Sequence, residues 1–478
     1  MDLTALTATQ AAYAIKKGNI TAVILAEALA KQVRKMQSVN ALVGFNEDAF
    51  FEQAEAADKI SASGRPLGPL HGVPLVIKDN IDVAGMATTA ATPALAANVA
   101  RRDAPVTKAL RKAGAVIMAK ANMHELAYSP GITQPEGGGE IVYGAYGATR
   151  NPHDEERSPA GSSTGTAAAI AACMAPAGLG TDTGGSVRNP AAWCGIDGFR
   201  PSMGRYSQSG IVPISWTRDT PGPLARSITD LALLDGVLSG EDGLPREDLN
   251  RLRLGIERDY FCTDVDTGIL SVFEEEVRRL RDAGADIIDV TIPALEKTVA
   301  SAGQSIAQYE IVRALPRYLA AAYTGVGFEE LTDSIAASGL GAMLKGLNGA
   351  MAIPEETYRM VIDEVRPALQ KAYADCFAEQ NLDALIFPTT LNLPFKLQKP
   401  GTHRHKGRNI SDFAAVGHNV QPASIGGSPG LTAAAGVVPT GLPAAIGFDG
   451  PRGTDRKLLA IGIAYEAIRP GVPALPDR

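Results

Sequence analysis

Two glycine-rich turns that carry serines lie on either side of an alanine-rich stretch. The first, Gly161–Gly165, reads GSSTG, and the second, Thr181–Ser186, reads TDTGGS. The stretch Thr166–Ala175 between them is predicted to be a tightly packed helix, because alanine has the highest helix propensity and permits close approach. Serines in glycine turns beside a buried helix suit nucleophilic chemistry. Glycine and serine are also the commonest turn residues, so two ordinary turns are an equal alternative at this point.

A lysine follows the short apolar run Val73–Ile77, which is predicted to be a buried strand. Burying an ammonium group is costly, so Lys78 either extends its amine to solvent or has a lowered pKa and is neutral. A neutral lysine could be the general base of a hydrolase without a catalytic histidine, with one serine relaying a proton to a second, nucleophilic serine. Consecutive backbone N–H groups in TDTGGS could bind the oxyanion.

Other catalytic signatures are missing from the sequence, which has no GxxxxGK[ST], no GxGxxG after a strand, no HExxH and no paired Cys/His cluster. GSSTG satisfies GxSxG, but an esterase of the α/β-hydrolase type needs a buried strand directly before that turn, and the preceding NPHDEERSPA is polar. That alternative would use His418. His403 and His405 could both reach a metal, although a solvated basic loop at His403–Asn409 is the preferred interpretation. We therefore expect no cofactor and no metal.

The composition indicates a folded globular protein. The 478 residues are 45% hydrophobic and 20% charged, as in ordinary globular chains. The net charge of −7 argues against a general nucleic-acid binder. No signal-peptide pattern or membrane-length apolar run is visible, so we expect a cytoplasmic monomer or homodimer that acts on a small molecule, without nucleic acid or membrane partners. Free thiols are expected for the four scattered cysteines, Cys173, Cys194, Cys262 and Cys376.

Hydrophobic periodicity predicts alternating helices and strands. Helices are expected within residues 1–60, one of them beginning after Thr21 as its N-cap. Helix–strand units are expected at Pro105–Asn122 and Phe273–Thr291, and such units favour an α/β layered sheet. Residues 301–360 are predicted to be helical and could cover a pocket, which the abundance of Ala, Gly, Met and Leu at 331–353 predicts to be apolar.

Several motifs together resemble the amidase signature family. They are GVPLVIKDNI, NMHELA, YGATRNP, RSPAGSSTGTAAAIAA, LGTDTGGSVRNPAAWCGIDGFRP and GLPAAIGFDG, and they extend over most of the chain. The resemblance implies an α/β fold: an α/β/α sandwich around a large mixed β-sheet, with a helical substrate-covering region. It further implies a single domain over 1–478, with catalytic core motifs at 60–235 and a variable, substrate-determining region at 300–420.

The resemblance also implies a Ser–cis-Ser–Lys triad. Ser186 matches the nucleophile, and Ser162, 24 residues earlier, matches the serine that follows a cis peptide bond. Lys78 matches the general base. The oxyanion hole is matched by the backbone N–H groups of Thr183, Gly184, Gly185 and Ser186.

Three further positions match supporting roles. Asp182 and Arg188 are expected to hold the two turns through hydrogen bonds and an ion pair, with a surface pair as the alternative. Ser163 is expected to be a donor near Lys78.

The predicted activity is hydrolysis of the C–N bond of small amides through an acyl-enzyme. The stretch GFRPSMGRYSQSGIVPISWTRDTPGP is similar to indoleacetamide and mandelamide hydrolases, which favours aryl- or alkyl-bearing amides; anilides and carbamates (urethanes) are further candidates. One alternative is the glutaminase subunit of a tRNA-dependent amidotransferase, but Asn189 stands where that subunit carries glutamine. Another is a scaffold protein that has lost activity, against which the intact Lys78, Ser162 and Ser186 argue.

Overall fold

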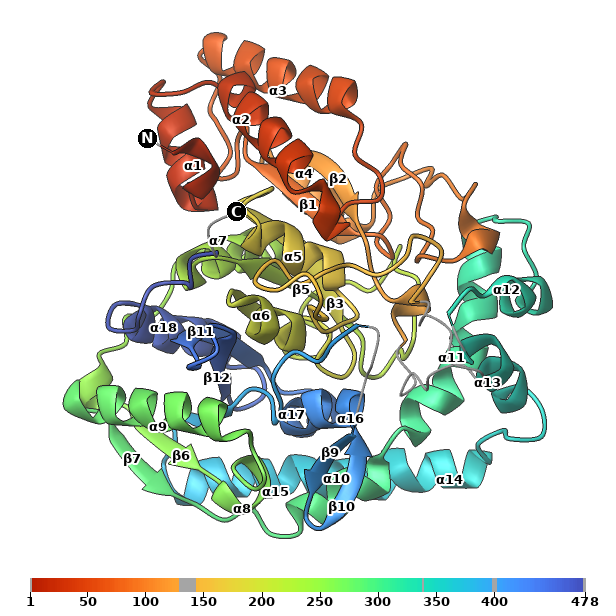
Figure 1. Cartoon of the computed structure of the whole chain (residues 1–478), viewed down its shortest axis with the longest axis vertical. Helices are drawn as coiled ribbons and strands as arrows, with labels where there is room; N and C mark the ends of the chain where they lie inside the picture. The colour runs from red at the N-terminus through yellow and green to blue at the C-terminus, as the bar shows by residue number, and fades with distance from the viewer. Residues whose placement is uncertain (1, 129–142, 338, 398–401, 476–478) are drawn as a thin grey trace.

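A ten-stranded mixed sheet forms the centre of the computed structural model, which describes residues 2–128, 143–337, 339–397 and 402–475 (Figure 1). The order of its strands is β2-β1-β3-β5-β4-β11-β12-β8-β6-β7. Their bounds are β1 Pro74–Lys78, β2 Val116–Ala121, β3 Ala177–Asp182, β4 Asp197–Arg200, β5 Thr220–Ala225, β6 Arg253–Ile256, β7 Asp286–Asp289, β8 Ala384–Pro388, β11 Gly430–Val437 and β12 Pro443–Asp449.

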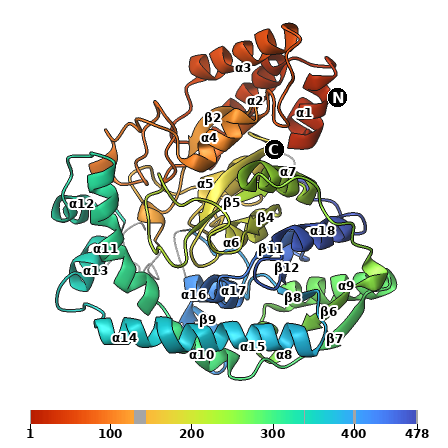
Figure 2. The ribbon, with the colours of Figure 1, turned by 180° about the vertical axis from the view of Figure 1, so that it is seen from behind.

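Helices pack along the faces of this sheet (Figures 1 and 2). α2 begins directly after Thr21, whose hydroxyl accepts a hydrogen bond from the Ile24 N–H, so the predicted N-cap is confirmed. The helices are α1 Ala8–Lys16, α2 Ala22–Lys35, α3 Glu47–Ala62, α4 Pro105–Lys112, α5 Thr164–Ala171, α6 Arg188–Cys194, α7 Ile228–Ser239, α8 Arg258–Phe261, α9 Thr267–Asp282, α10 Leu295–Ala302, α11 Ser305–Ala321, α12 Phe328–Ser334, α13 Leu340–Leu347, α14 Glu355–Met360, α15 Arg366–Glu379, α16 Asp412–Gly417, α17 Gln421–Gly426 and α18 Asp455–Glu466.

Adjacent strands show that helices cover both faces of the sheet. Gly198 in β4 faces α6, because a β-carbon there would lie 2.8 Å from Ala191. The next residue, Phe199, pairs with Leu431 in β11, and Leu431 packs against Gly462 of α18. Successive residues of a strand point to opposite faces, so α6 and α18 lie on opposite sides of the sheet. This arrangement confirms the predicted α/β/α sandwich.

The strand β1 brings Lys78 into the interior. All five of its residues are buried, and it lies between β2 and β3, parallel to both. Parallel strands that are covered on both faces consist of nearly continuous apolar residues. The buried strand predicted from the apolar run before Lys78 is therefore confirmed. Because the three strands are parallel, Lys78 lies at the same edge of the sheet as Thr181 and Asp182, which end β3.

The alanine-rich helix α5 is shorter than expected and begins two residues earlier. Every one of its eight residues is buried. A β-carbon on Gly165 would lie 2.2 Å from the carbonyl oxygen of Ala41 and 2.5 Å from the nitrogen of Asn122, so only glycine permits this approach. The helix ends at Ala171 because Cys173 turns the chain with a left-handed backbone (φ 56°), and the Met174 N–H donates back to the Ala169 carbonyl at 2.8 Å.

The basic segment His403–Asn409 is not a loop, as the sequence predicted, but most of a β-hairpin. β9 Thr402–His405 and β10 Arg408–Ser411 pair antiparallel. The turn residue Lys406 has a φ of 47°, and its backbone N–H donates to the Asp264 carboxylate.

Among the described residues, none of the helices has the length and apolar content that crossing a membrane requires.

Candidate active site

Lys78 lies under the first glycine turn with its amine fully enclosed. Its Nζ donates to Ser162 Oγ at 2.8 Å and to Thr181 Oγ1 at 2.8 Å, and the side chain has no exposed surface. Thr181 Oγ1 also accepts from the Asn80 side-chain amide at 3.1 Å. Strand β1 therefore places the lysine amine against one hydroxyl of each glycine turn.

Burial lowers the pKa of Lys78 from 10.5 to about 7, although the carboxylates of Asp182 and Asp219 act in the opposite direction. A lysine with this pKa is partly neutral at neutral pH and can accept a proton. His124, which is also buried, has its pKa lowered to about 3 by desolvation and by the charge of Lys78. The imidazole is therefore neutral and adds no positive charge beside the lysine.

The first turn places Ser162 through its close packing on His124. The peptide bond between Gly161 and Ser162 is cis, and the Ser162 carbonyl accepts from the His124 backbone N–H at 3.2 Å. A β-carbon on Gly161 would lie 2.3 Å from the His124 ring, so this position has no space for a side chain. The imidazole in turn stacks on Tyr143, with ring centroids 5.1 Å apart.

Ser163, expected to be a donor near Lys78, bonds to Thr181, whose own hydroxyl contacts the lysine. Its hydroxyl donates to the Thr181 carbonyl at 3.2 Å and accepts from the Thr181 N–H at 3.3 Å. Its own N–H donates to the Ser186 carbonyl at 3.2 Å. Ser163 thus joins the two turns through the backbone, and the second hydroxyl on Lys78 is that of Thr181, which the sequence analysis did not single out.

The second turn is built around the buried carboxylate of Asp182. This carboxylate accepts from the N–H groups of Gly185 at 2.8 Å and Val187 at 3.2 Å. It also pairs with Arg188 at 3.1 Å and with Arg200 at 2.9 Å. Burial alone would raise the pKa of Asp182, but the two guanidinium groups outweigh it and hold the pKa well below its usual value.

The ion pair of Asp182 and Arg188 therefore lies in the interior rather than on the surface. Arg188 is 1% exposed, and its Nη2 also donates to Ser424 Oγ at 2.6 Å, which connects the second turn to α17. The hydrogen bonds of this pair all stabilise the second turn; the first turn is joined to it by Ser163.

Three of the four predicted oxyanion donors are unoccupied. Within the described part of the chain, the N–H groups of Thr183, Gly184 and Ser186 have no hydrogen-bond acceptor, whereas the Gly185 N–H is engaged by Asp182. The geometry thus restricts the available donors of this turn to Thr183, Gly184 and Ser186.

Ser186 lies in the wall of a cavity of about 120 Å³. In the described structure, no hydrogen bond joins its hydroxyl to Ser162 Oγ or to another group. Hydrogen bonds between catalytic groups are often long before substrate binds, so the hydroxyl is free to meet a substrate that enters the cavity.

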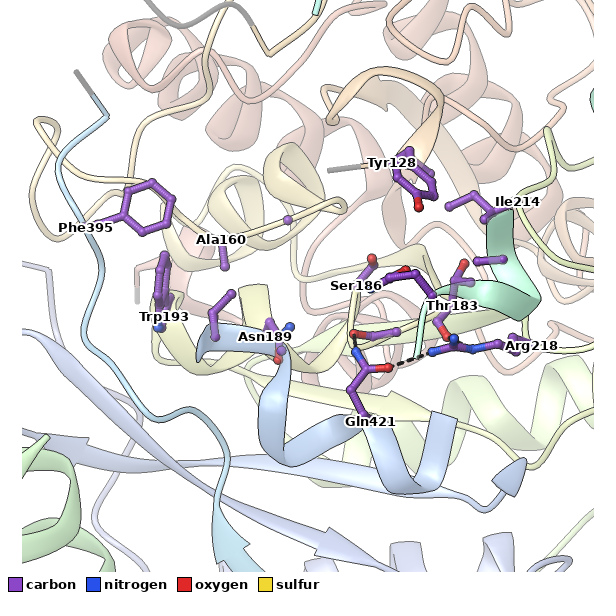
Figure 3. A pocket seen from close by; sticks show the side chains of 17 residues that line it. Tyr128, Ala160, Thr183, Ser186, Asn189, Trp193, Ile214, Arg218, Phe395 and Gln421 are labelled. Atoms are coloured by element: carbon purple, nitrogen blue, oxygen red, sulfur yellow. Dashed lines mark hydrogen bonds between the residues drawn. The ribbon is translucent and has the colours of Figure 1, made fainter. Parts of the chain in front are cut away.

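The cavity is apolar at one end and polar at the other. Figure 3 shows Trp193 and Phe395 on one side of Ser186, and Arg218 with Gln421 on the other. Trp193 and Phe395 pack edge to face with ring centroids 5.3 Å apart. The lining also includes the aromatic ring of Tyr128 and five small or aliphatic residues, which are Ala127, Ala160, Ile214, Ala307 and Val416.

The prediction that residues 331–353 form an apolar pocket is wrong. The described residues that line the cavity include none of this stretch. Its leucines, among them Leu331 and Leu344, are buried in a separate core with Ile311 and Leu315 of α11. The apolar residues of 331–353 therefore pack on a neighbouring helix instead of lining the cavity. The helical region reaches the cavity through Gln304 and Ala307, at the start of α11.

The histidines considered in the sequence have partners other than the two serines. His418 stacks on Tyr260 with ring centroids 4.3 Å apart and lies beside His405, and burial lowers its pKa to about 4. His403 hydrogen-bonds the Asp264 carbonyl at 2.6 Å. In the described ranges, no group of three His, Cys, Asp or Glu residues could hold a metal ion, and the four cysteines are free thiols.

Comparisons with known proteins identify the family of this chain. The profile of the family described as Amidase matches residues 24–459. Mandelamide hydrolase of Pseudomonas putida is 37% identical, covering 97% of this chain and 91% of the relative, and indoleacetamide hydrolase of Agrobacterium vitis is 36% identical, covering 95% and 94%. A glutamyl-tRNA(Gln) amidotransferase subunit of Chloroflexus aurantiacus is more distant, at 32% identity over 98% and 97%. The crystal structure of the peptide amidase of Stenotrophomonas maltophilia superposes with a TM-score of 0.80, at 27% identity over 99% of each chain.

The chain therefore belongs to the amidase signature family. It is an amidase, a hydrolase that acts on carbon–nitrogen bonds other than peptide bonds.

Proposed function

We propose that this amidase attacks its substrate with Ser186 and that Ser162 and Lys78 move the proton. Lys78 in its neutral form accepts a proton from Ser162, which takes one from Ser186 as Ser186 Oγ attacks the amide carbonyl. The N–H groups of Thr183, Gly184 and Ser186 bind the oxyanion of the tetrahedral intermediate. The proton returns through Ser162 to the leaving ammonia or amine, and water hydrolyses the acyl-enzyme by the same route.

The observation that supports this scheme most directly is the Lys78–Ser162 contact. A fully buried amine that is 2.8 Å from a serine hydroxyl and has a pKa of about 7 is suited to act as a base near neutral pH. An ordinary structural lysine would extend its charge to solvent. The hydrogen bond from Ser163 to the Ser186 carbonyl supports the same scheme, because it keeps the two serine turns adjacent.

We further propose that the substrate is a primary amide with an aryl group on its acyl side. Trp193 and Phe395 at the apolar end of the cavity would contact the ring, and the similarity to mandelamide and indoleacetamide hydrolases agrees with an aryl acyl group. Anilides and carbamates are attacked by the same chemistry, so they belong in the same screen.

The test is a screen of the purified chain over primary amides, anilides and carbamates, with Ser186→Ala as the control. We expect aryl-bearing primary amides to be hydrolysed fastest, and Ser186→Ala to lose at least about a thousandfold in kcat. A fluorophosphonate probe should label the wild-type protein at Ser186. Near wild-type turnover by Ser186→Ala would refute the proposed nucleophile, and preference for an anilide or carbamate would refute the proposed substrate alone.

A further inference from the structure

Three consecutive backbone carbonyls in the nucleophile turn each accept a hydrogen bond from a side chain. Arg200 Nη1 donates to the Asp182 carbonyl. Arg218 Nε donates to the Thr183 carbonyl at 3.2 Å, and Gln421 Nε2 donates to the Gly184 carbonyl at 3.2 Å. The back of the turn is therefore held at every peptide from 182 to 184.

The three donors come from different parts of the fold and are joined to one another. Arg200 ends β4, Arg218 lies in the loop before β5, and Gln421 begins α17. Arg200 Nη2 donates to the Arg218 carbonyl at 2.8 Å, and Arg218 Nη2 donates to Gln421 Oε1 at 2.8 Å. Figure 3 shows the Arg218–Gln421 hydrogen bond beneath Thr183 and Ser186.

Peptide planarity converts these carbonyl contacts into control of the N–H groups. In a trans peptide, the carbonyl of one residue and the N–H of the next lie in one plane and point in opposite directions. A donor that holds the Asp182 carbonyl therefore directs the Thr183 N–H, and one that holds the Thr183 carbonyl directs the Gly184 N–H. Both of these N–H groups are among those that, in the described structure, have no acceptor within the turn.

Gly184 has a specific reason to lack a side chain. A β-carbon there would lie 3.2 Å from Gln421 Nε2 and 3.3 Å from Arg218 Nη2. Such distances are shorter than ordinary van der Waals contact, so a side chain would push both donors away from the turn. The glycine thus permits Arg218 and Gln421 to approach the backbone directly.

Arg218 is also held firmly enough to direct the turn. Only 2% of its surface is exposed, and burial, together with the neighbouring Arg200, lowers its pKa to about 10, so it stays charged at neutral pH. Its loop is anchored by the buried Glu310 of α11, which accepts from the Thr217 N–H at 3.1 Å and from the Thr217 hydroxyl at 2.9 Å.

We propose that Arg218 is a positioning residue that aims the oxyanion-binding N–H group of Gly184, as Arg200 aims that of Thr183. Gln421 acts through Arg218, because it accepts a hydrogen bond from the Arg218 guanidinium. A charged donor on the Thr183 carbonyl also polarises that peptide and strengthens its N–H as a donor, because hydrogen bonds in a chain reinforce one another. The inference rests on the proposed function, in which these N–H groups bind the tetrahedral intermediate. It assigns to Arg218 a role in the transition state rather than in holding the substrate before reaction.

The test compares Arg218→Met and Gln421→Met with wild-type protein on the best aryl amide from the screen. Two probes separate the states: benzylboronic acid, which forms a tetrahedral adduct with a serine nucleophile, and phenylacetate, which is trigonal. We expect kcat and the affinity for the boronate to fall together, about 10- to 100-fold for Arg218→Met and less for Gln421→Met. KM and the affinity for phenylacetate should stay within about threefold, since loss of one oxyanion donor acts mainly on kcat.

Arg226→Met is the matched control. Arg226 also donates to backbone carbonyls, those of Ile170 and Ala175 at 2.8 and 2.9 Å, but it has no contact with the nucleophile turn in the described structure. Its substitution should lower thermal stability and leave kcat and the ratio of boronate to phenylacetate affinity unchanged. If Arg218→Met does not fold, Gln421→Met carries the test, because it removes one neutral side chain and leaves the ion pairs intact.

Two results would overturn the inference. One is a raised KM with unchanged kcat, which would make Arg218 a contact for the ground-state substrate. The other is a lower kcat with unchanged boronate affinity. Failure of the proposed function is seen separately, as absence of fluorophosphonate labelling at Ser186 in the wild-type protein.

Discussion

Replacing Thr181 with valine tests the assignment of Lys78 as the general base. Thr181 Oγ1 accepts one of the two hydrogen bonds of the Lys78 amine, and valine has nearly the same shape and a high propensity for strands. A hydrogen bond to a charged group contributes about 1.5–3 kcal/mol and one between neutral groups about 1 kcal/mol. Loss of this hydrogen bond should therefore destabilise the charged form of Lys78 relative to the neutral form by about 1–2 kcal/mol. The pKa of Lys78 should fall by about one unit as a result.

The direction of this change follows from which form of Lys78 is active. In the wild-type protein, kcat/KM should rise with pH through about 7 as the lysine loses its proton, and level off above. Thr181→Val should move this acid limb downward by about one pH unit, because its lysine deprotonates more easily. The height of the plateau should fall, since the resulting base is weaker.

The assay is the pH dependence of kcat/KM between about pH 5 and 9, which reports groups of the free enzyme. Thr181→Ser is the matched control: it keeps the hydroxyl, so its acid limb should stay at the wild-type position. An acid limb of Thr181→Val that coincides with wild type, or that moves to higher pH, would refute the assignment of the limb to Lys78.

Three further substitutions test the packing of the site. Gly161→Ala places a methyl group against the buried His124 ring, 2.3 Å from its nearest atom, and should cost about 1–3 kcal/mol in the free energy of unfolding, measured in urea. Arg188→Met removes one of the two partners of the buried Asp182 carboxylate and should cost about 3 kcal/mol or more in the same assay. Phe395→Ala should raise KM about tenfold for aryl amides, because the ring loses an aromatic contact.

Each of these substitutions has a control. Gly471→Ala adds a methyl group at an exposed glycine with no atom near its β-carbon and should be close to neutral. Arg359→Met breaks an exposed pair with Glu355, which contributes at most about 1 kcal/mol. For Phe395→Ala, acetamide is the control substrate, since it has no ring to contact. Equal effects of a test substitution and its control would contradict the packing argument.

Stability should also depend on the titration of Lys78. Between about pH 7, its pKa in the fold, and its ordinary value near 10.5, the unfolded chain binds more protons at this residue than the folded chain does. Stability from this group therefore increases as pH rises through that interval. Lys78→Met should remove this contribution, so its urea midpoint should depend less on pH between 7 and 9.

The sequence by itself determined the elements whose signals are local. The apolar run before Lys78 predicted β1, because a strand that is buried on both faces is apolar at successive positions. Thr21 marked the start of α2, because an N-cap side chain bonds to the backbone only a few residues later. The glycine turns and the resemblance of their motifs were enough to predict the family, the α/β/α sandwich and the three residues proposed for catalysis.

What only the tertiary structure decided depends on contacts between distant segments. Leucines at 331–353 have the composition of a pocket but are buried against α11, since apolar content does not specify which surface a residue covers. Thr181 and Arg218 lie in stretches that the sequence singled out, and Gln421 does not, but no local pattern indicates what any of the three contacts. Their roles arise because the sheet brings Thr181 to Lys78 across 103 residues, and because α17 reaches the nucleophile turn across 237. A hydrogen bond needs a donor and an acceptor about 3 Å apart, and between remote segments only the packed fold sets that distance.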